Sequence, residues 1–180
     1  MFNIFSKRKS KCEVCQLSSD QGIIVGYDPT DRGEFSQNGE KQKLCLTHFK
    51  EKFLEDIKSF DGFAACFLPK KKWNSYSYIS LDKAKEWNIS EKDITEIKVQ
   101  LQQASLSQRC SYCPSAPHFL FYNYAYEPDF YKKKLVQKPK VFCARHLVEQ
   151  IVLEIKSRNL QIDEINLPYG AFGLYMHGDY

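Results

Sequence analysis

Two short ligand motifs, each present twice, decide the fold of this chain. The first pair is Cys12-Glu13-Val14-Cys15 with Cys45-Leu46-Thr47-His48, and the second is Cys110-Ser111-Tyr112-Cys113 with Cys143-Ala144-Arg145-His146. Both quartets have the form C-x₂-C-x₂₉-C-x₂-H, and every position in the second lies 98 residues after its counterpart in the first. Two quartets with identical gaps indicate an internal duplication.

The same offset continues beyond the ligand positions. Phe49, Phe53, Leu54 and Ile57 map onto Leu147, Ile151, Val152 and Ile155. Apolar residues at this spacing predict an amphipathic helix with one buried stripe. We therefore expect each C-x-x-H motif to open a helix.

Strands are predicted on both sides of each helix. Residues 23–29 and 121–128 each form an apolar and aromatic run ended by a proline, which is typical of a strand followed by a turn. The glycine-containing apolar stretches 62–68 and 170–176 predict a closing strand in each copy. The expected unit is a cysteine knuckle, a β-hairpin, a helix and a closing strand.

The predicted fold class is α+β, with two pseudo-repeated modules and a helical insert. We expect a basic tail over 1–11, a first zinc module over 12–68, an insert over 69–108 and a second zinc module over 109–180.

The insert has no counterpart elsewhere in the chain. Leu81–Trp87 and Glu91–Ala104 predict two helices, with Ser90 as an N-cap for the second. A helix-turn-helix DNA reader is one interpretation, but a packed helical connection is favoured because short helix pairs are common in any fold.

The quartets predict two zinc ions. Zn²⁺ prefers four tetrahedral ligands, and thiolate and imidazole suit it better than carboxylate. A C-x-x-C turn brings two sulfurs to one ion, and a C-x-x-H motif at a helix start supplies the other two ligands. The expected ligands are Cys12, Cys15, Cys45, His48, Cys110, Cys113, Cys143 and His146.

These motifs resemble those of treble-clef zinc fingers, in a Cys₃His version. The resemblance covers residues 10–68 and 108–176, and it departs from the pattern where Gln16 and Pro114 replace the usual glycine after the knuckle. It implies a structural metal and no single function, since such modules serve nucleic-acid binding, protein binding and occasionally nuclease chemistry.

Cross-braced sites, in which the two C-x-x-C pairs share an ion, are the alternative arrangement. A duplicated unit must have had its own complete site, so self-contained sites are favoured. Four protein ligands leave no open position on the metal, which predicts a structural role without catalysis.

Two other side chains, Cys66 and His118, could take part in a chemical reaction. Cys66 lies outside both quartets on an apolar run and is interpreted as a buried small hydrophobe rather than a reactive thiol. His118 is a conceivable general base for a nuclease-type enzyme, but no companion histidine or carboxylate motif surrounds it. We expect no enzyme activity.

The second hairpin carries the candidate binding surface. Alternation along 119–126 separates Phe119 and Phe121, which suit the core, from a tyrosine face that is followed by lysines. Such a surface can stack on bases and contact phosphates, or it can pack internally. Its residues are Tyr122, Tyr124, Tyr126, Tyr131, Lys132, Lys133, Lys134, Lys138 and Lys140.

Charge slightly favours a protein partner over nucleic acid. The 180-residue chain has 26 basic and 22 acidic side chains, and the excess is matched by Lys7, Arg8, Lys9 and Lys11 of the tail. The remainder is neutral, although its second half is more basic than its first. No apolar run approaches membrane-spanning length. An odd number of cysteines with C-x-x-C spacings indicates metal binding rather than disulfides, and we expect an intracellular, cytoplasmic protein.

Overall fold

The structure is a computed structural model that describes residues 9–27, 42–60, 63–67, 74–82, 106–126, 133–135 and 138–158. Its elements, in chain order, are β1 (Ile24–Tyr27), β2 (Gln42–Cys45), α1 (Leu46–Lys58), β3 (Phe63–Phe67), β4 (Asn74–Ser80), β5 (Phe119–Tyr126), β6 (Lys133–Leu135), β7 (Lys140–Phe142) and α4 (Ala144–Arg158). The α+β class predicted from the sequence is confirmed. No helix in these ranges has the length and apolar character needed to cross a membrane.

The duplication is visible in the order of elements. In the first copy β1 pairs antiparallel with β2, which runs directly into α1. In the second copy β5 pairs antiparallel with β7, and α4 begins two residues after that strand. Each C-x-x-H motif therefore opens a helix, as predicted, and each helix buries the expected apolar stripe.

The two helices also end alike. The Ser59 hydroxyl donates to the Asp56 carbonyl at 3.0 Å, and the Ser157 hydroxyl donates to the Glu154 carbonyl at 2.9 Å. These pairs are related by the same 98-residue offset as the ligands. The repeat therefore includes the hydrogen bonds of the last helical turn.

The hairpins of the two copies differ in register. In the first copy Val25 lies opposite Leu44, whereas Phe142, the counterpart of Leu44, lies opposite Phe119 and not Asn123. In the second copy β7 is therefore shifted by four residues along β5, relative to the pairing that the 98-residue offset predicts. Five residues lie between Cys113 and β5, against eight between Cys15 and β1. The compensation is in the pairing, because 18 residues separate Phe121 from its partner Lys140, against 14 between Tyr27 and its partner Gln42.

A strand that the sequence analysis did not predict connects the copies. β4 lies in the segment interpreted as a helical insert, and it pairs with β3 on one side and β5 on the other. Only Leu81–Asp82 of the two expected helices falls within the described residues, and both are helical. The closing strand expected over 62–68 is confirmed as β3, and its expected counterpart over 170–176 lies outside the described residues.

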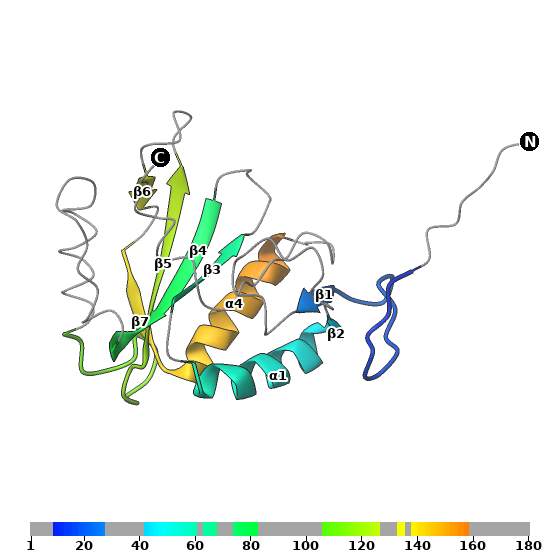
Figure 1. The fold of residues 1–180 in the computed structure, drawn as a ribbon, viewed down its shortest axis with the longest axis horizontal. Coiled ribbons are helices and arrows are strands. Elements are labelled where there is room, and N and C mark those ends of the chain that lie inside the picture. Colours follow the sequence, from blue (N-terminus) through cyan, green and yellow to red (C-terminus); the bar gives the residue numbers. More distant parts are fainter. Residues whose placement is uncertain are drawn as a thin grey trace, which may run out of the picture.

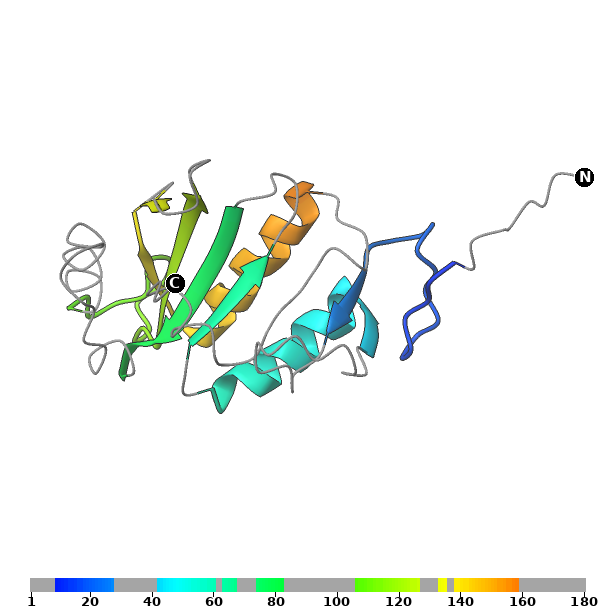
Figure 2. The ribbon, with the colours of Figure 1, turned by 45° about the horizontal axis from the view of Figure 1, so that its top comes forward.

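One hydrophobic core runs through both copies. α1 and α4 lie side by side (Figures 1 and 2), with α4 against β5 and β7 of the larger sheet and α1 against β1 and β2. Phe49 and Phe53 of α1 stack with ring centroids 5.4 Å apart, and Phe53 meets Tyr78 of β4 edge-on at 6.1 Å. Phe60 continues the chain of rings from Tyr78 to Phe119 at 5.5 and 6.3 Å. The copies therefore share a core, and the contact between Phe60 and Phe119 joins the rings of the first copy to those of the second.

Candidate metal centres

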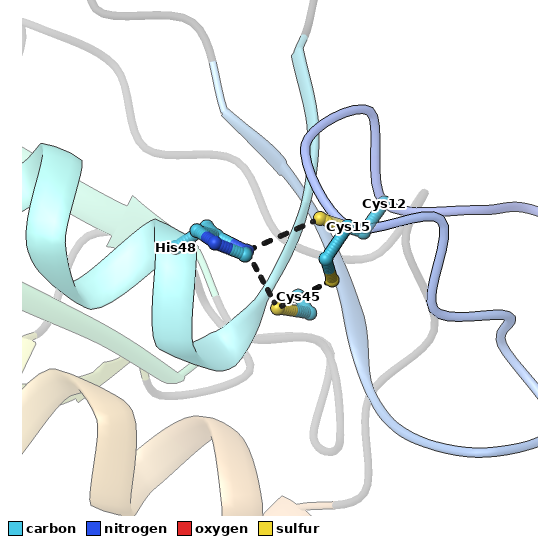
Figure 3. A group of neighbouring side chains, drawn as sticks. All are labelled: Cys12, Cys15, Cys45 and His48. Carbon is cyan, nitrogen blue, oxygen red and sulfur yellow. Dashed lines mark hydrogen bonds between the residues drawn. The ribbon is translucent and has the colours of Figure 1, made fainter.

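The first ligand group gathers at the start of α1 (Figure 3). Cys12 and Cys15 come from a tight loop, Cys45 ends β2, and His48 lies in the first turn of the helix. Cys12 Sγ and Cys45 Sγ lie 3.5 and 3.2 Å from His48 Nδ1, and the Sγ atoms of Cys15 and Cys45 are 3.9 Å apart. All four ligand atoms lie within 4.8 Å of one another.

The second group repeats this geometry. Cys110 Sγ and Cys143 Sγ lie 3.4 and 3.3 Å from His146 Nδ1, and the Sγ atoms of Cys113 and Cys143 are 3.9 Å apart. Each group draws its four members from one copy, so the arrangement is self-contained and not cross-braced. Each group could hold one metal ion.

The separations suit a tetrahedral ion of zinc's size. Bonds of about 2.3 Å to sulfur and about 2.0 Å to nitrogen imply S–S edges of about 3.8 Å and S–N edges of about 3.5 Å. The observed S–S edge is 3.9 Å in both groups, and the observed S–N edges run from 3.2 to 3.5 Å. The side chains are therefore already arranged for a single ion.

Backbone hydrogen bonds hold both knuckles in place. The Glu13 amide donates to the Lys43 carbonyl at 2.8 Å, and its counterpart, the Ser111 amide, donates to the Val141 carbonyl at 2.8 Å. Gln16 has φ 61°, a left-handed conformation that favours glycine. This is the position where the sequence departs from the treble-clef glycine, so the geometry is kept although the residue differs.

Hydrogen bonds tune the thiols toward the form that binds metal. Burial raises the pKa of the Cys12 thiol, but backbone N–H donors of its loop, led by Cys15, outweigh burial and lower that pKa to about 6. Hydrogen bonds from Ser115 lower the pKa of Cys113 to about 6, whereas burial raises the pKa of Cys143. Each group thus favours one thiolate at neutral pH, and a thiolate is the metal-binding form.

The two centres differ in how well they are covered. Cys15 is exposed, whereas its counterpart Cys113 is half-buried. In the second copy the Tyr112 ring stacks on Phe142 at 5.4 Å and lies 5.8 Å from the His146 ring. The counterpart of Tyr112 is Val14, a smaller side chain that is 61% exposed. The second centre therefore has an aromatic cover.

A carboxylate adds to this difference. Glu149 Oε2 lies 3.8 Å from His146 Nε2, the ring nitrogen that does not face the sulfurs. Glu149 Oε1 is positioned by Arg145 Nε at 3.0 Å and by Lys50 Nζ of α1 at 3.6 Å, and the hydrogen bond from Arg145 lowers the pKa of Glu149. Among the described ion pairs none joins His48 to Glu51, the counterpart of Glu149. Carboxylates behind a histidine ligand orient the ring and raise its basicity.

The structure describes only part of the predicted binding surface. Phe119 and Phe121 are buried in the core, as expected. For Tyr122, Tyr124 and Tyr126 on β5, and for Lys133 and Lys134 on β6, the structure describes the backbone alone, with Tyr126 opposite Lys133 and Ala125 opposite Lys134. Tyr131 and Lys132 lie outside the described residues. Lys138 is exposed beyond the sheet.

Lys140 belongs to a different surface. It lies opposite Phe121 in register, and its Nζ donates to the Tyr112 hydroxyl at 2.9 Å. The sequence analysis did not single out Tyr112. The internal repeat could have indicated Tyr112, because Tyr112 and Val14 occupy the same position in the two knuckles. Residues at the tip of a knuckle are exposed, so an aromatic residue there is a candidate for binding.

Two further candidates from the sequence are His118 and Cys66. His118 is exposed, and its backbone bonds to Phe142 and Leu81. Cys66 lies on β3, opposite Tyr76 of β4, as a strand residue.

Comparisons with known proteins give no relative for this chain. No protein-family model matches it, and neither a curated protein nor a solved structure shows significant similarity. The class of the protein therefore comes from its fold and sites: an α+β protein with two Cys₃His groups, each able to bind a metal ion.

Proposed function

We propose that the protein is a non-enzymatic binding protein in which each Cys₃His group holds one structural Zn²⁺. The observation that carries this proposal is the gathering of three sulfurs and one Nδ1 within 4.8 Å in both groups. Soft thiolates with one imidazole in tetrahedral array favour zinc over magnesium, calcium or manganese. Thiolate ligands persist in reducing compartments, which supports an intracellular setting.

The structural role follows from the number of ligands. Four protein atoms fill the tetrahedron, so no position is left for a water molecule or a substrate. In both copies these ligands tie a loop, a strand end and the first turn of a helix to one point. The residues would thus hold together segments that lack enough apolar surface to dock unaided.

The test of this proposal is metal analysis combined with metal removal. Purified protein is expected to contain two zinc ions per chain by inductively coupled plasma mass spectrometry. Stripping them with a strong chelator is expected to abolish the near-ultraviolet circular dichroism, and added Zn²⁺ is expected to restore it, because metal binding and folding are coupled. A protein that stays folded after complete removal of zinc would contradict a structural role.

The first centre is less covered by protein than the second, and this difference predicts which centre loses its metal ion first. We expect the first centre to release zinc first and Cys15 to react with N-ethylmaleimide at least about fivefold faster than Cys113 in the zinc-loaded protein, because metal binding makes both sulfurs thiolates and the Cys15 sulfur is the more exposed of the two. Mass spectrometry of peptides after limited labelling measures both sites in one sample.

The matched control removes the aromatic cover. Tyr112→Val gives the second knuckle the residue of the first, and it should raise the labelling of Cys113 toward that of Cys15. Equal labelling of the two cysteines in the unmodified protein would show that cover does not govern their reactivity.

A further inference from the structure

Tyr112 is an exposed aromatic residue that is nevertheless held rigidly. The residue is 54% exposed, yet its ring stacks on Phe142 with an interplanar angle of 11° and meets His146 at a tilt. Phe142 is fully buried, so it is a fixed platform. One face of Tyr112 is therefore occupied by protein, and its orientation is set before any partner arrives.

Lys140 lies at the hydroxyl end of this ring. Its Nζ is 2.9 Å from the Tyr112 hydroxyl and 5.2 Å from the ring centre. The ammonium group thus contacts the hydroxyl oxygen and also lies over the ring, toward its hydroxyl end. Tyr112 is more than half exposed, so its ring offers accessible aromatic surface for stacking beside a positive charge.

The chain around Tyr112 is predominantly basic. The described stretches 106–126 and 138–148 contain Arg109, Lys138, Lys140 and Arg145 and no aspartate or glutamate. Arg145 is paired with Glu149, whereas Arg109 and Lys138 are exposed. The corresponding stretches of the first copy, 9–27 and 42–50, also contain four cations but include Glu13 and Asp20. Even with the single negative charge of a Zn(Cys)₃(His) centre, the second knuckle has the more positive surface.

We infer that Tyr112, Lys140, Arg109 and Lys138, here called the Tyr112 patch, bind single-stranded nucleic acid. One base would stack on the accessible surface of the Tyr112 ring, and the three cations would contact the neighbouring phosphates. Aromatic stacking with adjacent positive charge is the basis of sequence-tolerant single-strand binding. This inference specifies the partner of the proposed binding function and rests on it.

A protein partner fits this patch less well. The centres of protein interfaces are depleted of charged residues, lysine among them, and are built from clustered apolar side chains. Tyr112 has a lysine at its hydroxyl and lies in the stretch 106–126, which contains no aspartate or glutamate. A stacked base with its phosphates satisfies both the ring and the cations.

The experiment uses the full zinc-loaded chain with fluorescently labelled 15-nucleotide oligo-dT and oligo-U, followed by anisotropy at several salt concentrations. We expect binding of single strands in preference to a duplex, with log Kd rising by about 2 per tenfold increase in salt, since three phosphate contacts contribute about 0.7 each. The DNA and RNA arms show which backbone is preferred. Absence of salt-dependent binding to both would overturn the inference.

Variants then locate the site. Tyr112→Ser is expected to weaken binding about tenfold, and Tyr112→Phe to keep most of it, because stacking needs the ring and not the hydroxyl. Lys140→Gln should lower the salt slope by about 0.7. Val14→Ser, at the same knuckle position in the first copy, should bind as the unmodified protein does.

A second comparison separates the two surfaces of this copy. Replacing Lys132, Lys133 and Lys134 with glutamine tests the hairpin surface that the sequence suggested. If this triple variant loses binding while Tyr112→Ser keeps it, the Tyr112 patch is not the site. Zinc content measured for each variant distinguishes loss of the patch from loss of the second metal centre.

Discussion

Replacing Cys110 with serine is expected to leave at most one zinc ion per chain and to abolish cooperative unfolding. Cys110 is buried, and its sulfur lies 3.4 Å from His146 Nδ1. Zinc binding by structural sites is worth about 10–16 kcal/mol in peptides, which equals or exceeds the about 5–15 kcal/mol by which most domains are stable. Metal analysis together with thermal unfolding, followed by circular dichroism, measures both effects.

The control for this experiment is Cys66, the one cysteine of the sequence that lies outside both ligand motifs. Cys66→Ala removes a thiol outside both groups, so the variant should keep two zinc ions. A Cys110→Ser protein that retains two zinc ions and an unchanged transition would show that the second group is not a metal centre.

The second large effect is expected from the shared core. Leu147→Ala truncates a fully buried side chain on α4 and should lower the free energy of unfolding by about 2–5 kcal/mol, since it removes apolar contact and leaves a cavity. Because the core is continuous from α4 to α1, both copies should lose structure in one transition at a lower denaturant concentration. Urea unfolding, followed in parallel by circular dichroism and by release of zinc to a coloured chelator, tests this.

The same helix supplies a matched control. Leu153→Ala makes an identical chemical change at a side chain that is 59% exposed, and it should alter stability by no more than about 0.5 kcal/mol. If Leu147→Ala produced two separate transitions, with only the second centre affected, the copies would be independent folding units.

Local patterns in the sequence were sufficient for the repeated parts. The helices at both C-x-x-H motifs, their buried stripes and the closing strand β3 all follow from short-range spacing. β4 was missed even though Asn74-Ser75-Tyr76-Ser77-Tyr78-Ile79-Ser80 alternates polar and aromatic residues, because the lysines before it and the helical pattern after it favoured an insert.

The register of the second hairpin could not be read from the repeat. Equal ligand spacing sets how many residues lie between the C-x-x-C and C-x-x-H motifs of each copy. It does not set how many of those residues precede the first strand and how many connect the two paired strands. In the second copy Pro114 and Pro117 lie in the short link between Cys113 and β5. The core then selects Phe119 and Phe121 as the residues that face the helices.

The sequence by itself determined the eight ligand side chains, their division into two groups and the helix that begins at each second pair. These features depend on spacings of a few residues, which chain geometry translates directly into shared faces and turns. The tertiary structure alone decided that the copies share one core in which Phe60 meets Phe119, that the second centre is covered, and that Lys140 meets Tyr112. Such contacts join residues distant in the chain, and their free energy depends on the packing of the whole molecule, so no local pattern encodes them.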